Sequence, residues 1–413
     1  MKSSKMGLGL LVACGLAYGS AGAMPVPRET STQDGVTWIY TLDNGQAAVT
    51  GVVSPAQGVL TIPSTLGGRP VTAIAFTAFE NNANIAVMNI PDSVTAIGVR
   101  AFEGCSNLQA VNIGNNVTNI GAFAFSECKA LSAVAFGKRV ETIDDAAFYE
   151  CEKLTSLKLP DSVKTIGTHV FSGCFGLESV SLGKSVESIG RCAFEDCGRL
   201  ETLVLPDSLK QLEDSVFLWC DSLTNMVVPN GVTNLERDVF GECQSLKSVV
   251  LPDHLTALGE NLFSNCYALA SVTIPDTVTN IGAGAFWSCA SLTELTIPAG
   301  VTAIGDNAFA YCNSSATLHL PTSLRYSLGK AGIPAGCTLD FYVNQQTAIF
   351  NANGGSCGTS RRIYELDVPY GELPEATRAH HVFAGWWTEA SGGERVQESD
   401  IVQAVEFRTI YAH

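Results

Sequence analysis

Cysteine is the residue whose type and spacing most invite chemistry in this sequence. The chain holds 14 cysteines, and ten of them, from Cys105 to Cys312, follow one another at intervals of 23 residues. Such a column has three interpretations: buried thiols of small, weakly polar character, disulfides between neighbouring repeats, or a metal site.

Geometry and spacing favour the first interpretation. Parallel Cβ vectors about 4.8 Å apart exceed the separation of about 3.8 Å that a disulfide prefers. No repeat carries the Cys-x-x-Cys or histidine spacing of zinc sites. We therefore predict a buried column of thiols and no metal site. The best candidate for a single disulfide is Cys192 with Cys197, five residues apart.

Residues for catalysis show no comparable pattern. The six histidines are His169, His254, His319, His380, His381 and His413. None lies in an H-E-x-x-H run or beside a plausible serine or cysteine nucleophile, and the sequence has no G-x-S-x-G and no phosphate-binding loop. We predict that the protein is not an enzyme and needs no cofactor.

Two sets of apolar residues are candidates for partner binding. Val204, Val227 and Val250 stand seven residues after the cysteine of three successive repeats, on a strand face that should point outward. Six aromatic residues adjoin the cysteines: Tyr149, Phe175, Trp219, Tyr267, Trp287 and Tyr311. Among these we select Trp219, Tyr267 and Trp287, because exposed aromatic side chains are typical contacts for proteins or sugars. The alternatives are ordinary exposed valines and aromatic packing between adjacent turns.

The elements that position these residues repeat with the same period of 23. A phenylalanine precedes each cysteine by three residues, and apolar residues follow the cysteine at plus six and plus eight, as in Val272 and Ile274. That alternation predicts a strand facing a core, and the Pro-Asp that often follows predicts a turn. We expect Ala285-Phe286 to begin one helical or 3₁₀ turn, and Gly259, Gly282 and Gly305 to adopt positive φ. A unit this short cannot bury its own apolar face, so the copies must stack into a solenoid.

The repeated run Ala-Phe-Glu-Gly-Cys-Ser-Asn-Leu at 101–108, followed by a strand, Pro-Asp-Ser-Val and Thr-x-Ile-Gly, resembles the BspA-like leucine-rich repeat. The resemblance covers residues 59–326, about eleven units. It implies an α/β, strand-rich leucine-rich-repeat solenoid with a parallel sheet along one face. It also implies an exported or surface protein that binds other molecules without altering them.

The two ends of the chain differ from the repeats. Residues 1–23 read as a signal peptide with an Ala-Gly-Ala cleavage site, and the alternative is a lipid anchor on Cys14. Residues 24–58 predict an N-terminal cap with a hairpin at Asp43-Asn44-Gly45. Residues 327–346 predict a C-terminal cap and linker. No segment is long and apolar enough to predict a membrane span.

Residues 347–413 form a separate unit, in which Asn-Gly-Gly and Gly-Gly turns separate aromatic strands. This unit resembles the Listeria–Bacteroides repeat, the B-repeat type of internalin-like proteins, which implies a small β-grasp-like C-terminal domain. That family usually ends in Tyr-Ala-x-Trp, whereas this chain ends at His413. We therefore expect its final strand to be less firmly held.

Composition narrows the class of role. Charged residues make up 15% of the chain and hydrophobic residues 46%, with a net charge of −16. The negative charge argues against nucleic acid as a partner. The sequence predicts a secreted or cell-surface scaffold that binds protein or glycan partners in adhesion. The alternative is a structural envelope protein whose repeats space or self-associate.

Overall fold

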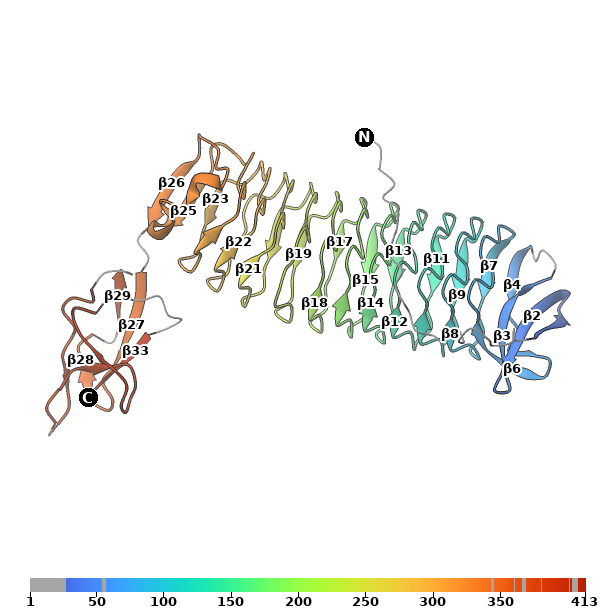
Figure 1. Ribbon diagram of the computed structural model, residues 1–413, viewed down its shortest axis with the longest axis horizontal. Helices are drawn as coiled ribbons and strands as arrows, with labels where there is room; N and C mark the ends of the chain where they lie inside the picture. The colour runs from blue at the N-terminus through green and yellow to red at the C-terminus, as the bar shows by residue number, and fades with distance from the viewer. Residues whose placement is uncertain are drawn as a thin grey trace, which may run out of the picture.

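The computed structural model describes residues 27–53, 57–342, 345–359, 361–365, 369–379, 381–400, 402 and 408–413. The predicted signal peptide and Cys14 lie outside these residues. Figure 1 shows that the repeats form rungs stacked side by side along one long axis. The architecture is rich in strands: the helical elements among the described residues are two 3₁₀ turns, η1 (Thr322–Leu324) and η2 (Leu328–Lys330).

Most rungs contribute a first short strand that pairs in parallel with the same strand of a neighbouring rung. These strands are β8 (Ala96–Ile97), β10 (Asn119–Ile120), β12 (Thr142–Ile143), β14 (Thr165–Ile166), β16 (Ser188–Ile189), β18 (Gln211–Leu212), β21 (Ala257–Leu258), β22 (Asn280–Ile281) and β24 (Ala303–Ile304). One sheet runs unbroken up to β18, and a second begins at β21. The ladder is therefore interrupted at the rung between them.

Most rungs also contain a second strand, and in several of these a buried central residue lies between two exposed ones, as the sequence predicts. These strands are β7 (Ile85–Asn89), β9 (Ala110–Asn112), β11 (Ala133–Ala135), β13 (Ser156–Lys158), β15 (Ser179–Ser181), β17 (Thr202–Leu203), β19 (Asn225–Val227), β20 (Ser248–Val250), β23 (Glu294–Thr296), β25 (Thr317–Pro321) and β26 (Thr338–Tyr342). In β13, Leu157 is buried while Ser156 and Lys158 are exposed.

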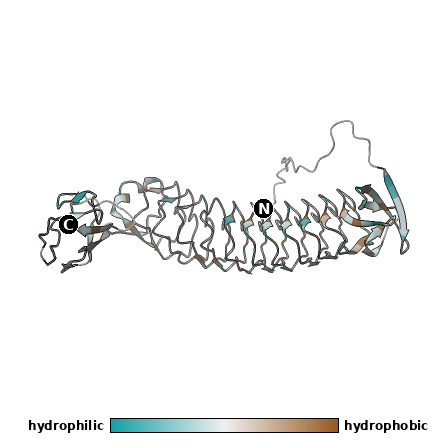
Figure 2. Ribbon diagram, turned by 90° about the horizontal axis from the view of Figure 1, so that it is seen from below, coloured by the Kyte–Doolittle hydropathy of each residue, from teal (hydrophilic) through white to brown (hydrophobic). Residues whose placement is uncertain are grey.

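The N-terminal end is closed by six strands. They are β1 (Arg28–Gln33), β2 (Val36–Asp43), β3 (Gln46–Val52), β4 (Gly58–Thr61), β5 (Thr65–Leu66) and β6 (Arg69–Ile74). Of these, β1, β2, β3 and β6 extend the first sheet, β5 pairs with β6, and β4 pairs with β7 in the other sheet. The predicted hairpin is present: β2 and β3 pair antiparallel around Asn44 and Gly45, both at positive φ. The edge strand β1 is almost wholly hydrophilic (Figure 2), which discourages pairing with another chain.

The repeated phenylalanines form one stacked column through the rod, hereafter the Phe column. Its members are Phe79, Phe102, Phe125, Phe148, Phe171, Phe194, Phe217, Phe240, Phe263, Phe286 and Phe309. Successive ring centroids lie 5.0–5.8 Å apart, and Trp38 caps the column edge-on at 6.5 Å. Stacked aromatic pairs contribute about 0.5–1.5 kcal/mol beyond burial, so the column links every rung to the next.

The cysteine column is buried, as predicted, and its thiols have a specific partner. Each Sγ donates to the carbonyl of the phenylalanine in the preceding repeat, as Cys128 does to Phe102 at 3.2 Å. The prediction of a Cys192–Cys197 disulfide is wrong for this structure, in which both are free thiols. Cys197 donates to the carbonyl of Phe171 at 3.2 Å, whereas Cys192 lies beside Glu195 on another part of the turn.

Linked turns connect the two strands of a rung, and two predictions about them need correction. The chain around Ala285-Phe286 forms successive turns rather than a helical turn. Gly282 lacks positive φ; instead, a Cβ there would lie 2.6 Å from the carbonyl carbon of Gly259. Glycine is needed at this position because neighbouring backbones approach closely.

The C-terminal end of the rod is closed by β25, β26, η1 and η2. The remaining strands, β27 (Gln345–Asn351), β28 (Ser356–Cys357), β29 (Arg361–Glu365), β30 (Ala376–Thr377), β31 (Trp386–Trp387), β32 (Arg395–Val396) and β33 (Arg408–Ala412), form a small unit with its own core. Its main sheet has the order β29-β27-β33-β31-β32. The expectation of a less firmly held final strand stays a prediction; β33 lies between β27 and β31, and His413 stacks on Trp387 at 4.5 Å.

Candidate functional site

The linked turns form one side of the rod, hereafter the turn face, and this side carries the variable side chains. In each repeat the residues two before and two after the phenylalanine have left-handed backbone, as Asp238 and Glu242 do around Phe240. Alternate N–H groups of the turn donate to the next rung: Phe240 N–H donates to the carbonyl of Leu262 at 3.1 Å. Equivalent side chains therefore project side by side from neighbouring rungs.

A groove on the turn face spans four rungs, hereafter the Trp219–Trp287 groove. It has a volume of about 460 Å³ and is lined by Leu218, Trp219, Asp238, Gly241, Glu242, Asn261, Ser264 and Trp287. The residue after the phenylalanine is small in the two middle rungs, Gly241 and Ser264, and large in the flanking rungs. The groove exists because these two small residues leave room between Leu218 and Trp287.

Acidic groups determine the charge of the groove. Burial, with further repulsion from Asp214 and Glu260, raises the pKa of Asp238, although Arg237 and Asn261 favour the ionised form. Asn265 donates to Glu242 at 2.6 Å. The groove thus presents two tryptophans, two carboxylates, an amide and a hydroxyl.

The predicted contact residues fall on different sides of a rung. Trp219 and Trp287 share the groove, with Trp219 45% exposed and Trp287 half-buried against Tyr311 at 4.9 Å between ring centroids. Tyr267 is exposed but does not line the groove.

The three valines, hereafter the valine stripe, lie on the strand side of the rod. Val204, Val227 and Val250 are 83%, 61% and 58% exposed. Val227 and Val250 are direct neighbours in the β19–β20 register. Val227 and Val250 therefore form a continuous apolar strip, and Val204 holds the same repeat position one rung earlier.

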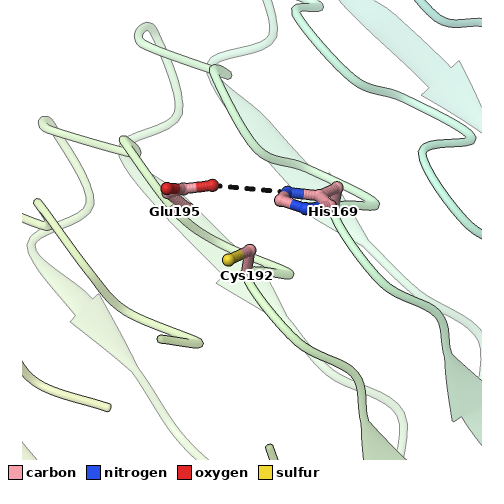
Figure 3. Close-up of side chains that lie close together, drawn as sticks. All are labelled: His169, Cys192 and Glu195. Carbon is pink, nitrogen blue, oxygen red and sulfur yellow. Dashed lines mark ion pairs between the residues drawn. The ribbon is translucent and has the colours of Figure 1, made fainter. Parts of the chain in front are cut away.

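A second constellation on the turn face was missed by the sequence analysis: His169, Cys192 and Glu195, hereafter the His169 cluster. Figure 3 shows the three side chains converging from adjacent rungs. Their ligand atoms all lie within 4.8 Å of one another, and His169 Nδ1 is 3.3 Å from Glu195 Oε2. His169 and Cys192 hold the same place in successive repeats, 23 residues apart, with φ of 54° and 55°. The signal in the sequence was a cysteine out of step with the column, aligned with a histidine one repeat earlier.

Burial sets the protonation of Cys192, whereas hydrogen-bonding and charged neighbours set that of Glu195. Burial, together with the neighbouring Glu195 charge, raises the pKa of the Cys192 thiol to about 12. Burial opposes ionisation of Glu195, but the contacts with His169, Cys192 and Ser172 outweigh it and lower the pKa of that carboxyl. The cluster therefore holds a neutral thiol beside an ionised carboxylate. A neutral thiol is a poor nucleophile, but the sulfur, the imidazole nitrogen and the carboxylate oxygen are all atoms that bind metals.

Comparison with known protein families identifies the repeats. A model of the BspA type leucine rich repeat region matches residues 72–201, 141–270 and 233–331. The chain belongs to the BspA-type leucine-rich repeat family. A model of the Listeria-Bacteroides repeat domain matches residues 347–413. Both resemblances inferred from the sequence are confirmed, and members of the repeat family serve as interaction scaffolds.

Several solved structures are similar to this chain. A leucine rich cell surface protein from Faecalibacterium prausnitzii A2-165 is 26% identical, with a TM-score of 0.51, and the match covers 78% of this chain and 96% of that one. A leucine-rich repeat protein from Bacteroides ovatus is 26% identical with a TM-score of 0.40, covering 76% and 99%. The pneumococcal vaccine antigen PcpA is 19% identical with a TM-score of 0.44, covering 76% and 85%. A search of curated proteins finds no match. Among the described residues, no helix has the length and apolar character needed to cross a membrane.

Proposed function

We propose that this protein is an exported scaffold that binds a glycan partner in the Trp219–Trp287 groove and performs no catalysis. The single observation that carries the proposal is the groove, in which two tryptophans flank a floor of small residues. Indole rings offer flat apolar surfaces with little conformational entropy to lose, while carboxylates and amides accept and donate hydrogen bonds to hydroxyl groups. That combination suits a sugar chain lying across several rungs.

Export and surface location are part of the proposal. The similar protein from Faecalibacterium prausnitzii is described as a cell surface protein. The leader at residues 1–23 supports export, with cleavage after Ala23 or lipidation at Cys14. Mass spectrometry of the mature N-terminus distinguishes these routes: a free Met24 supports cleavage, a lipid-modified Cys14 supports anchoring, and an intact Met1 contradicts export by either route.

A glycan array followed by calorimetry tests the groove. We expect Trp219→Ala and Trp287→Ala each to weaken the best glycan about tenfold or more, as truncation of an aromatic anchor typically does. The matched control is Phe175→Ala, an exposed aromatic beside the cysteine turns that does not line the groove. Equal weakening by the control, or no glycan bound by the parent, contradicts the proposal.

The valine stripe favours a second candidate function, contact with a protein partner. Apolar side chains at the centre of a contact, surrounded by polar residues, are typical of protein interfaces. Val227→Ser is expected to leave folding intact and weaken capture of a protein partner. Val59→Ser, an exposed valine on β4, is the control.

The same variants test the structural alternative, in which copies of the chain associate with one another. Light scattering of the parent and of Val227→Ser decides this point. A parent that associates, and a variant that does not, supports a self-associating spacer. A monomeric parent contradicts self-association through the stripe.

A further inference from the structure

The His169 cluster departs from the repeat pattern at two adjacent places. Within residues 105–312 every other cysteine follows its phenylalanine by three residues, whereas Cys192 precedes Phe194 by two. One rung earlier the same place holds His169, and the flanking rungs hold Ala146 and Ser215 there. Two residues capable of binding metal thus occupy consecutive rungs, and Glu195 follows Cys192 by three residues.

The geometry already approaches a coordination site. A tetrahedral metal with bonds of about 2.0–2.2 Å to nitrogen and oxygen holds those two ligand atoms about 3.4 Å apart. The observed separation between His169 Nδ1 and Glu195 Oε2 is 3.3 Å. All three ligand atoms lie within 4.8 Å of one another, so Cys192 Sγ must move by about 1 Å or less to reach the metal.

The surroundings leave these atoms available and oriented. His169 Nδ1 is buried without a hydrogen-bond partner, facing Glu195. The hydroxyl of Ser172, itself buried, donates to Glu195 Oε2 at 3.3 Å and fixes that carboxylate. Hydrogen bonds of this kind commonly orient metal ligands. The side chains of His169 and Glu195 are 29% and 19% exposed, so solvent reaches one side of the cluster.

We propose that His169, Cys192 and Glu195 bind a divalent cation of the zinc class, with a fourth position open to water. One sulfur, one imidazole nitrogen and one carboxylate oxygen form a donor set typical of Zn²⁺ and unlike the all-oxygen sets of Ca²⁺ and Mg²⁺. On binding, the Cys192 thiol releases its proton to solvent and the sulfur becomes a thiolate ligand. The site joins two neighbouring rungs and does not depend on the proposed glycan or protein partner.

Titration of the metal-free full chain with Zn²⁺ tests the proposal. The parent should bind one equivalent of Zn²⁺ at least about tenfold more tightly than Cys192→Ser or Glu195→Gln does. Ser172→Ala should lower the affinity for the same equivalent about 10–100-fold. Substitution with Co²⁺ gives a second readout, because a thiolate–cobalt absorption band should appear in the parent and be absent from Cys192→Ser. Circular dichroism checks that each variant is folded.

The chain offers a matched control in His319, which also lies between two carboxylates but has no adjacent thiol. His319→Gln should bind Zn²⁺ as the parent does and keep the cobalt band. The proposal is overturned if Cys192→Ser binds like the parent, if His319→Gln weakens binding equally, or if the parent shows no thiolate–cobalt band. Should Cys192→Ser fail to fold, the near-isosteric Glu195→Gln replaces it in the same comparison.

Discussion

The rod is built differently before and after β18. In the first part, one sheet continues from the N-terminal cap to β18, and the intervals of the Phe column up to Phe194 are 5.0–5.7 Å. After Phe194 the intervals are 5.5–5.8 Å, and the sheet stops and restarts. The buried columns continue through both parts, so the difference lies in the backbone ladder and the surface.

One position in the repeat accounts for much of this difference. The residue four before the phenylalanine is glycine in most rungs, including Gly167 and Gly190, where adjacent backbones nearly touch. At the interruption it is Glu213 and then Glu236. A single side chain at this place does not interrupt the sheet, because Asp144 occupies it directly after β12, which pairs with β10 and β14. Two neighbouring carboxylates, however, repel each other. The Trp219–Trp287 groove, the proposed glycan site, lies over these rungs and their neighbours.

The largest expected effect on stability comes from the Phe column, which both parts of the rod share. Phe125→Ala and Phe240→Ala should each lower the free energy of unfolding by about 3–5 kcal/mol, because each leaves a cavity in the same column. Urea denaturation measures this. Phe175→Ala, at an exposed position, should change stability little. A loss below 1 kcal/mol for Phe240→Ala alone would mean that the second part does not share a continuous core.

A substitution with a smaller expected effect on stability should make the first part of the rod resemble the second. In Gly190→Ala the new Cβ would lie 2.7 Å from the carbonyl carbon of Gly167, so the rungs must separate. We expect a loss of about 1–3 kcal/mol and weaker hydrogen-exchange protection in β14 and β16. Gly198→Ala is the control, since its Cβ would meet no atom closer than 4.0 Å. Unchanged protection in β14 would show that close backbone contact does not maintain the ladder.

Removing a carboxylate from the second part of the rod should stabilise the protein by an amount that depends on pH. Burial, and then the charges of Asp214 and Glu213, raise the pKa of Glu236 above its ordinary value of 4.5. Because the folded state binds this proton more tightly, stability should rise as pH falls through the raised pKa toward 4.5. Glu236→Gln should stabilise the protein at pH 7, and the gain should shrink as pH falls. Thermal unfolding of the parent and the variant at pH 7 and near pH 4.5 measures this gain in stability. A gain independent of pH would contradict the charge-based account.

Much of the fold could be predicted because its information is periodic. The phenylalanine, cysteine and strand positions recur in phase, so one unit predicts the buried columns of all. The conformation of Gly282 could not be predicted, because its constraint comes from the neighbouring rung and not from its own turn. The free thiol of Cys192 could not be predicted either. Cys192 and Cys197 are five residues apart, but this separation does not predict the direction of each side chain.

The candidate sites were only partly visible in the sequence. The exposure of Val227 and Trp219 followed from their places in the repeat, but the groove required Gly241 and Ser264 to be small between two larger neighbours. The His169 cluster joins residues of two rungs. Aligning repeats at their phenylalanines, rather than scanning for contiguous motifs, would have placed His169 beside Cys192.

The smallest expected effect concerns how exposed side chains join the rungs. In the first part, ion pairs such as Lys164 with Glu141, 3.0 Å apart, join neighbouring rungs. At the far end, His319 lies 3.0 Å from Glu294 and 2.8 Å from Asp340. The hydrogen bond to Asp340, with a further one to Glu294, raises the pKa of His319 above 6.5 despite some desolvation.

The stability that His319 contributes is therefore fully present below pH 6.5 and is lost as pH rises through the raised pKa. Because the site is exposed, His319→Gln should cost only about 0.2–1 kcal/mol at pH 6 and less at pH 9. Hydrogen exchange in β25 and β26 at both pH values resolves so local an effect, with β12 and β14 as internal references. If protection falls equally in all four strands, the end of the rod is coupled to its first part, and the two parts do not respond independently.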